Sequence, residues 1–360
     1  MFIYFVIFLL VTMLAFVYVK GPDSVVWRGG VLLLVFLVLF LPAALRYGIG
    51  TDYFMYIDSV EEYWGTGECM MELSFEWICD LCYFIGDSPQ WVIGFYAFFT
   101  YLLVLLAVRN KSFHVAVPVY VLTAYSFTYN IMRQELAVAL VTLAFALFLF
   151  GHYKGMVVFS IVAVFIHSSA IVFLPLLGGG FLMARLRKGI LLALIAVVAA
   201  GLYFVDISGT LMSFAQVHAK YASYSEQNGL ADAANLASGM GFWLRVLITG
   251  LICTVLTLYG KDRHARLMAV FCGFSIWFSM IGLHLEIFRR FVCVTDFVLP
   301  FAVAEMFVTS ASWGRWAGLA VVAGYVFIFS HDVCAEMLGK TVPNEIVPYR
   351  TIFSASGDSV

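Results

Sequence analysis

An acidic, tyrosine-rich stretch follows one of the apolar runs of this sequence. It reads YGIGTDYFMYIDSVEEYW over residues 47–64, contains four carboxylates and no Lys or Arg, and directly follows Arg46. Two glycines free the backbone before Asp52, so we expect a turn that presents this carboxylate, which could take the proton of a hydroxyl group. The rings of Tyr53 and Tyr56 could stack on the C–H face of a sugar, although aromatic residues at a membrane surface also serve as anchors.

Arginines recur at the ends of the apolar runs, and the planar fork of a guanidinium suits bidentate binding of phosphate. Side chains that reach the membrane surface from helix ends are the alternative, but a set of six arginines favours a site for a polyanion. Gln134 follows one of them at the start of a predicted helical run, where backbone N–H groups attract anions. The six are Arg46, Arg133, Arg245, Arg289, Arg290 and Arg350.

His167 lies in the apolar stretch FIHSSAIVFLPL. An ionisable residue inside a membrane segment is costly, which makes it a functional candidate; a neutral histidine bonded to a neighbouring helix is the alternative. Asp52 and His167 are the two candidates for a catalytic base. Because burial makes a histidine a poor base, we favour Asp52 as the base and His167 as a positioning residue.

The composition determines which elements must carry these side chains. Of the 360 residues, 63% are hydrophobic and only 12% are charged, and the mean hydropathy is +0.98. Since about 20 apolar residues cross a bilayer, we expect an all-α polytopic membrane protein with about 11–12 transmembrane helices. The continuously apolar runs argue against a β-barrel, and a net charge of −2 predicts no attraction to nucleic acid. We expect a single transmembrane domain, 1–360, whose outer loops 47–74 and 207–238 contribute to the site.

The distribution of basic residues predicts the orientation, because cytoplasmic loops are enriched in Lys and Arg. Twelve of the 20 basic residues form clusters that one alternation of helices places inside. Outside then lie 47–74, 130–132, 207–238, 286–290 and the tail after His331. The twelve inner residues are Lys20, Arg28, Arg109, Lys111, Lys154, Arg185, Arg187, Lys188, Lys261, Arg263, Arg266 and Arg315.

Two stretches depart from regular crossings. Leu73–Gly86 is too short and too acidic to span a bilayer, so we expect an interfacial or re-entrant helix on the outer side. Met156–Ala184 must leave and return within 29 residues, which predicts a broken or tilted hairpin that turns between His167 and Gly180. Broken helices occur at membrane depth where protein or water satisfies their backbone groups.

Five short motifs, spread over most of the chain, carry a resemblance to a known family. In chain order they are Arg46 with GTDYFMY, RQELAVAL from Arg133, FIHSSAIVFLPL around His167, FRRF at Phe288–Phe291 and VPYR at Val347–Arg350. With them the chain resembles the bacterial exopolysaccharide and O-antigen polymerases of the EpsG/Wzy type. The resemblance implies a fold similar to the GT-C glycosyltransferases. It also implies a multi-pass protein of the bacterial cytoplasmic (inner) membrane whose active site faces the periplasm.

A protein of this type would join undecaprenyl-pyrophosphate-linked oligosaccharide repeat units into O-antigen or exopolysaccharide. Its partners would be the lipid-linked glycans that serve as donor and acceptor, the membrane lipid and, as a further candidate, a polysaccharide chain-length regulator. No Asp-x-Asp motif occurs, so we expect a site without a metal or other cofactor. The candidate catalytic residues are Asp52, His167 and Arg133. The candidate substrate-binding residues are Arg46, Tyr53, Tyr56, Gln134, Arg245, Arg289, Arg290, Tyr349 and Arg350.

Two other functions stay open. A transporter of lipid-linked sugars or polysaccharides would often have repeated halves and charges near the midplane, whereas we find no repeat and the charges gather at one face. A membrane acyltransferase acting on a surface glycan could use His167, but it would leave the acidic stretch and the arginines unexplained. The residues therefore favour a polymerase.

The orientation can be tested by cysteine labelling in a background without the native cysteines. We expect Asp52→Cys and Arg350→Cys to react with a membrane-impermeant reagent from outside the cytoplasmic membrane. Arg263→Cys should react only once the cytoplasm is opened, because the Lys/Arg bias places it inside. Labelling of the Asp52→Cys variant from the cytoplasm alone would contradict this orientation.

Overall fold

The computed structural model describes residues 2–69, 71–110, 112–205, 239–285, 288–308, 312–338 and 346–355. Within these ranges the chain is helical, and extended backbone pairs only at an isolated antiparallel bridge between Arg46 and Thr351. The all-α class expected from the composition is confirmed. The expected outer loop 207–238 lies outside the described residues.

The helices group into two compact units, the first of which comprises Met1–Ile171 and Tyr325–Val360. The unit boundaries fall near the end of η2 (Ser168–Val172) and inside α18 (Ser312–Met337). The other helices of the first unit are α1 (Phe2–Lys20), α2 (Val25–Ala44), α3 (Tyr53–Thr66), α4 (Leu73–Tyr83), α5 (Gln90–Val108), α6 (Phe113–Thr123), η1 (Tyr125–Tyr129), α7 (Met132–Leu149), α8 (Tyr153–Ile166) and α19 (Ile352–Ala355).

The second unit comprises Val172–Gly324. One of its central helices is capped by Asp262, whose carboxylate accepts the N–H of Ala265 at 2.9 Å. Such an N-cap satisfies a backbone donor that the first helical turn leaves open. Besides part of α18, the described helices of this unit are α9 (Phe173–Met183), α10 (Lys188–Phe204), α14 (Met240–Tyr259), α15 (Arg263–Gly282), α16 (Arg289–Asp296) and α17 (Leu299–Val308).

Seven of the described helices are long and apolar enough to cross a membrane, namely α1, α2, α5, α7, α14, α15 and α18. The pair of α16 and α17, bent by 41° at the break between them, would give an eighth crossing. Four apolar stretches, 113–123, 153–166, 168–183 and 188–204, are shorter. The chain is therefore a multi-pass membrane protein. The expected number of about 11–12 crossings stays a prediction, because the shorter stretches would have to cross as well.

Helix α7 forms the core of the first unit. Its sequence MRQELAVALVTLAFALFL is apolar on every side after the first turn, and a helix of this kind is buried rather than placed at a surface. All residues from Gln134 to Ala146 are buried, and α7 packs against α5 and α8. Because the polar residues Arg133, Gln134 and Glu135 open this helix, its burial also encloses polar groups at one end of the unit.

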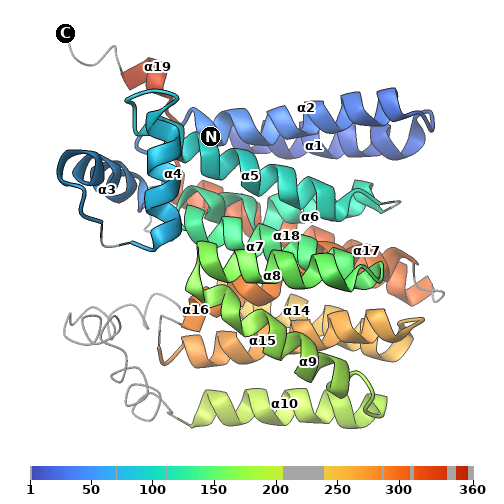
Figure 1. Cartoon of the computed structure of the whole chain (residues 1–360). Helices are drawn as coiled ribbons and strands as arrows, with labels where there is room; N and C mark the ends of the chain where they lie inside the picture. Colours follow the sequence, from blue (N-terminus) through green and yellow to red (C-terminus); the bar gives the residue numbers. More distant parts are fainter. Residues whose placement is uncertain are drawn as a thin grey trace. The chain divides into compact units, whose positions relative to one another are not determined.

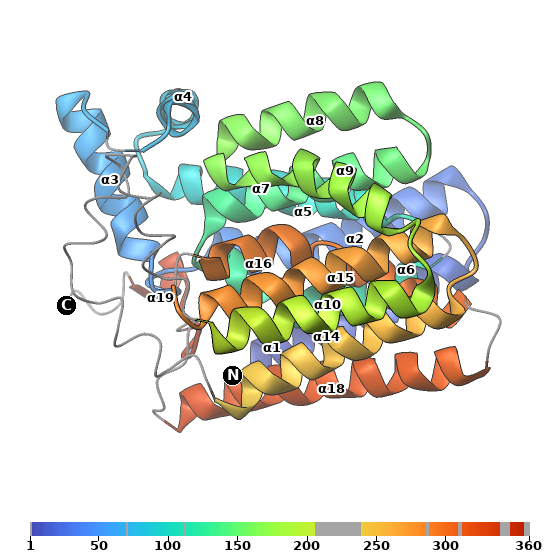
Figure 2. The same ribbon diagram turned by 90° about the horizontal axis from the view of Figure 1, so that it is seen from below.

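Helices α3 and α4 lie beyond one end of the long helices of the first unit, not alongside them (Figure 1, Figure 2). With 11 residues α4 is too short to span a bilayer, so the short helix expected within Leu73–Gly86 is confirmed. Tyr53, Tyr56 and Phe75 share one buried apolar cluster with Met132 at the start of α7. This cluster fixes both short helices against the polar end of α7.

Two glycines make the turn that leads into α3. Gly48 and Gly50 have φ angles of 59° and 96°, which glycine adopts far more easily than other residues. A Cβ at Gly50 would lie 2.5 Å from the carbonyl oxygen of Tyr129. This close approach lets the N–H of Thr51 donate to Oδ1 of Asn130 at 2.8 Å, which joins the turn to the segment before α7.

We therefore expect Gly50→Ala to destabilise the protein, because it combines this clash with backbone strain that alone costs about 1–3 kcal/mol. Thermal unfolding in detergent would measure the effect. Gly65→Ala is the matched control, since Gly65 is inside α3 and a Cβ there would meet no atom within 4 Å; it should be neutral or slightly stabilising. Equal melting temperatures for the two variants would contradict the described turn.

Candidate active site

Arg46 is buried, with 1% of its surface exposed. Its Nη1 donates to the carbonyl oxygen of Ala43 at 2.9 Å, and its Nη2 donates to that of Tyr129 at 3.2 Å. The guanidinium carbon lies 5.0 Å from the centroid of the Tyr129 ring, whose face attracts a cation. The side chain thus holds the end of α2 against the segment before α7. Its expected contact with a pyrophosphate stays a prediction.

A glutamine at the start of α5 holds the backbone around Arg46. Gln90 donates through Nε2 to the carbonyl oxygens of Ala44 at 2.6 Å and Arg46 at 3.1 Å. Its Oε1 accepts the hydroxyl of Tyr53 at 2.8 Å. Burial raises the pKa of Tyr53 to about 12, so this hydroxyl keeps its proton at neutral pH and remains a donor. Tyr53 therefore orients α3, and binding of a sugar by its ring stays a prediction.

Tyr349 and Arg350 belong to a C-terminal segment that pairs with the same turn. The hydroxyl of Tyr349 donates to the carbonyl oxygen of Pro42 at 2.9 Å. The N–H of Tyr47 donates to the carbonyl oxygen of Arg350 at 3.0 Å, next to the isolated antiparallel bridge. The Arg350 side chain is exposed. The backbone of this segment thus supports the turn, while the guanidinium remains open to solvent.

Asp52 occupies the N-cap position of α3 and is half-buried. Its carboxylate accepts the hydroxyl of Thr51 at 3.2 Å. Its carbonyl oxygen accepts the N–H of Tyr56 at 3.1 Å, so the two side chains lie one helical turn apart on the same face. The Tyr56 hydroxyl is a hydrogen-bond partner of Arg133. Helix α3 thus links Asp52 to Arg133 through Tyr56.

Arg133 forms an ion pair with Glu72, the residue directly before α4. Both side chains are largely buried, with 16% and 18% exposed respectively. The guanidinium carbon also lies 5.7 Å from the centroid of the Phe75 ring. The pair joins the first turn of α7 to α4 by a charge-assisted hydrogen bond, which is stronger than a neutral one. Sequence reasoning missed Glu72, although its place immediately before a short non-spanning helix was a signal.

The broken helix expected between His167 and Gly180 breaks at His167 itself. Helix α8 ends at Ile166, and His167 has extended backbone with φ −153° and ψ 125°. The backbone N–H of Ser169 donates to Nδ1 of His167 at 3.3 Å, and the Ser169 hydroxyl lies 2.8 Å from the same nitrogen. Because a backbone N–H can only donate, Nδ1 is an acceptor, and a neutral ring carries its proton on Nε2.

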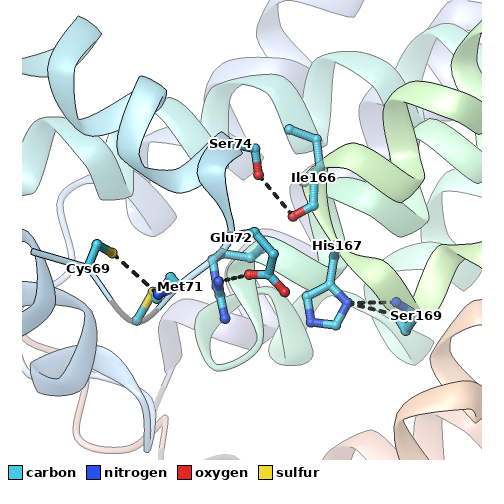
Figure 3. Close-up of polar contacts among 8 residues, drawn as sticks. Cys69, Met71, Glu72, Ser74, Ile166, His167 and Ser169 are labelled. Atoms are coloured by element: carbon cyan, nitrogen blue, oxygen red, sulfur yellow. Dashed lines mark hydrogen bonds and ion pairs between the residues drawn. The ribbon is translucent and has the colours of Figure 1, made fainter. Parts of the chain in front are cut away.

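Figure 3 draws Glu72, directly before α4, in one view with the hydrogen-bonded residues His167 and Ser169. In this view the Glu72 carboxylate and the His167 ring point to the same side of α4, and the hydroxyl of Ser74 donates to the carbonyl oxygen of Ile166 at 3.4 Å. A fixed cation, a ring donor and a nearby carboxylate could bind phosphate oxygens and accept a proton. Among the described residues, no group of three or more His, Cys, Asp or Glu side chains could hold a metal ion. The expected metal independence stays a prediction.

The remaining candidates lie deeper or in the other unit. Gln134 is 2% exposed in the first turn of α7. Arg245 of α14 and Arg289 and Arg290 of α16 belong to the second unit. Arg245 and Arg289 are half-buried and Arg290 is exposed. The first unit therefore contains Asp52, Arg133, His167 and Glu72, and a contribution of the second-unit arginines to the same substrate stays a prediction.

The sequence model of the EpsG family matches residues 31–351, a range that contains every candidate residue named above. The chain belongs to the EpsG family. No curated protein and no solved structure shows significant similarity to it. Membership of the EpsG family supports a polysaccharide-polymerase type of role in general, and the expected likeness to GT-C glycosyltransferases stays a prediction.

The ion pair between Arg133 and Glu72 should appear as energetic coupling in a double-mutant cycle. We expect Glu72→Gln and Arg133→Gln each to lower the free energy of unfolding. The double variant should lose less than the sum, by about 0.5–3 kcal/mol, because the two side chains are in contact. Glu62→Gln with Arg109→Gln, two exposed residues, should be additive. Additive losses at Glu72 and Arg133, measured by denaturant unfolding, would rule the pair out as a stabilising contact.

Proposed function

We propose that this EpsG-family protein is a glycosyltransferase that joins undecaprenyl-pyrophosphate-linked oligosaccharide repeat units into O-antigen or exopolysaccharide. Family membership supports the general polymerase role. The observation that carries the finer proposal is the largely buried Arg133–Glu72 pair, with Tyr56 as a further partner of Arg133. Such a pair offers a guanidinium with a fixed orientation at the end of a buried helix.

Arg133 and His167 would bind the pyrophosphate of the donor. Negative charge grows on the leaving pyrophosphate as the bond to the sugar breaks, and donors that are already in place stabilise it without reorganisation. Glu72 engages Nη1 of Arg133, while the buried Nε of Arg133 has no hydrogen-bond partner among the described residues. A buried N–H without a partner is costly, and a pyrophosphate oxygen would supply one. His167 would contribute the N–H at Nε2.

Asp52 would act on the acceptor. A hydroxyl oxygen of the acceptor sugar attacks the anomeric carbon of the donor and forms the new glycosidic bond. The bond from that carbon to the pyrophosphate oxygen breaks, and the electron pair leaves with undecaprenyl pyrophosphate. The hydroxyl proton passes to the Asp52 carboxylate, which is half-buried at the N-cap of α3 and close enough to solvent to release it.

We assign this site to the periplasmic face of the inner membrane, because the Lys/Arg bias favours that side for residues 47–74. Both substrates are lipid-linked, so the short helices α3 and α4 would lie at the surface from which the glycans extend. The reaction would need no metal. A chain-length regulator remains a proposed partner.

Joining of purified lipid-linked repeat units by purified protein tests the proposal. We expect Asp52→Asn to fold and to bind the units, but to join them about 10²–10⁴-fold more slowly, because the base is lost. His167→Gln should lose less, since it removes a positioning group. Asp58→Asn and His152→Gln change exposed residues of the same types and should join units at the normal rate.

Three outcomes would count against parts of this proposal. An active Asp52→Asn variant beside an inactive His167→Gln variant would exchange the two roles. Normal joining by both variants would remove both residues from the mechanism. Protein that moves lipid-linked units across a vesicle membrane and never joins them would favour the transporter.

A further inference from the structure

Basic residues gather at one end of the second unit, where α9 and α14 end and α10 and α15 begin. Figures 1 and 2 show these four helix ends on the same side of the unit, and α15 packs against each of the other three helices. The cluster lies entirely within the second unit and includes none of the residues of the proposed active site. Its members are Arg185, Arg187, Lys188, Lys261, Arg263 and Arg266.

Two of these arginines converge on one aromatic ring. The guanidinium carbons of Arg185 and Arg263 lie 5.0 Å and 4.0 Å from the centroid of the Phe181 ring. They come from the segment after α9 and from the first residue of α15. Stacking on a ring leaves the N–H groups at the guanidinium edge available for an anion. The shared ring thus brings two like charges together, which is unfavourable without an opposite charge nearby.

Neither arginine of this pair, Arg185 or Arg263, is held by a carboxylate ion pair among the described residues. The Asp262 carboxylate accepts a backbone N–H as the N-cap of α15, and Glu305 of α17 interacts electrostatically with both Asp262 and Lys261. The two guanidinium groups next to Phe181 are therefore available to an anion from outside the chain.

Apolar surface beside the cluster points to a lipid as the source of that anion. Leu182 and Ile190 are 62% and 54% exposed, and Tyr259 is 45% exposed. These residues lie within three positions of basic members of the cluster in the sequence. A free phosphate would gain nothing from such neighbours, whereas the acyl chains of a phospholipid would cover them.

We propose that this cluster binds the headgroup of an anionic phospholipid, with Arg185 and Arg263 on its phosphate and the apolar residues beside them on its acyl chains. Basic pockets between transmembrane helices on the cytoplasmic side take such headgroups. The Lys/Arg bias predicts this side for the cluster. This lipid site shares no residue with the proposed active site, so the test of one proposal does not depend on the outcome of the other.

Full-length protein in nanodiscs of phosphatidylcholine, with and without phosphatidylglycerol as the probe, tests the site. We expect phosphatidylglycerol to raise the melting temperature and to remain bound in native mass spectrometry. Arg185→Gln combined with Arg263→Gln should weaken this binding about 30-fold, because each basic side chain near an anionic surface contributes about fivefold. The control, Lys154→Gln with Arg315→Gln, removes the same charge outside the cluster and should bind like the wild type.

A second double variant that keeps the positive charge distinguishes weaker lipid binding from a loss of folding or an altered insertion. Arg185→Lys with Arg263→Lys should bind phosphatidylglycerol at least about threefold more weakly, because an ammonium lacks the planar fork and stacks less well. Wild-type affinity in either double variant would overturn the assignment. Equal stabilisation by inorganic phosphate in pure phosphatidylcholine nanodiscs would also overturn it, since a free anion would then suffice.

Discussion

The guanidinium of Arg46 is buried at the end of α2, where a charge needs hydrogen bonds to be tolerated. Carbonyl oxygens of Ala43 and Tyr129 provide them, so the end of α2 and the segment before α7 have to stay together. That constraint fixes the glycine turn, the turn sets where α3 begins, and α3 carries both Asp52 and Tyr56. The geometry around Arg133 therefore depends on Arg46, whose side chain donates its hydrogen bonds to backbone carbonyl oxygens.

The sequence predicted the parts of this arrangement that composition and local pattern control. An apolar composition gave the helical membrane class, the acidic apolar stretch after residue 72 gave a short non-spanning helix, and the context of His167 gave a helix break. The sequence did not predict that Glu72 pairs with Arg133, because the two residues lie 61 positions apart. Several other carboxylates in the same stretch were equal candidates. The hydrogen bond from Arg46 to Tyr129 was missed for the same reason, since the carbonyl oxygen that accepts it lies 83 positions away.

In the proposed mechanism, the carboxylate partner of Arg133 would have two opposing effects on the binding of a pyrophosphate. Glu72 offsets part of the positive charge of Arg133, which weakens the attraction to any anion, but it also fixes the plane of the guanidinium. Under that proposal the protein would release one pyrophosphate-linked carrier for each unit that it adds. A fully unpaired cation in a mostly buried place would retain that product, whereas a paired one can orient the donor and still let the carrier leave.

The C-terminal segment has a consequence for biosynthesis. Residues 346–352 emerge from the ribosome only after α18, yet they complete the backbone pairing next to Arg46. The carbonyl oxygen of Ile346 also accepts the hydroxyl of Tyr4 from α1 at 2.6 Å, so these late residues join segments made at very different times. A nascent or prematurely terminated chain would hold Asp52, Arg133 and His167 in the membrane without the pairing that supports the turn. The proposed activity would then require the C-terminal segment, and partial translation products that lack it would be inactive in the membrane.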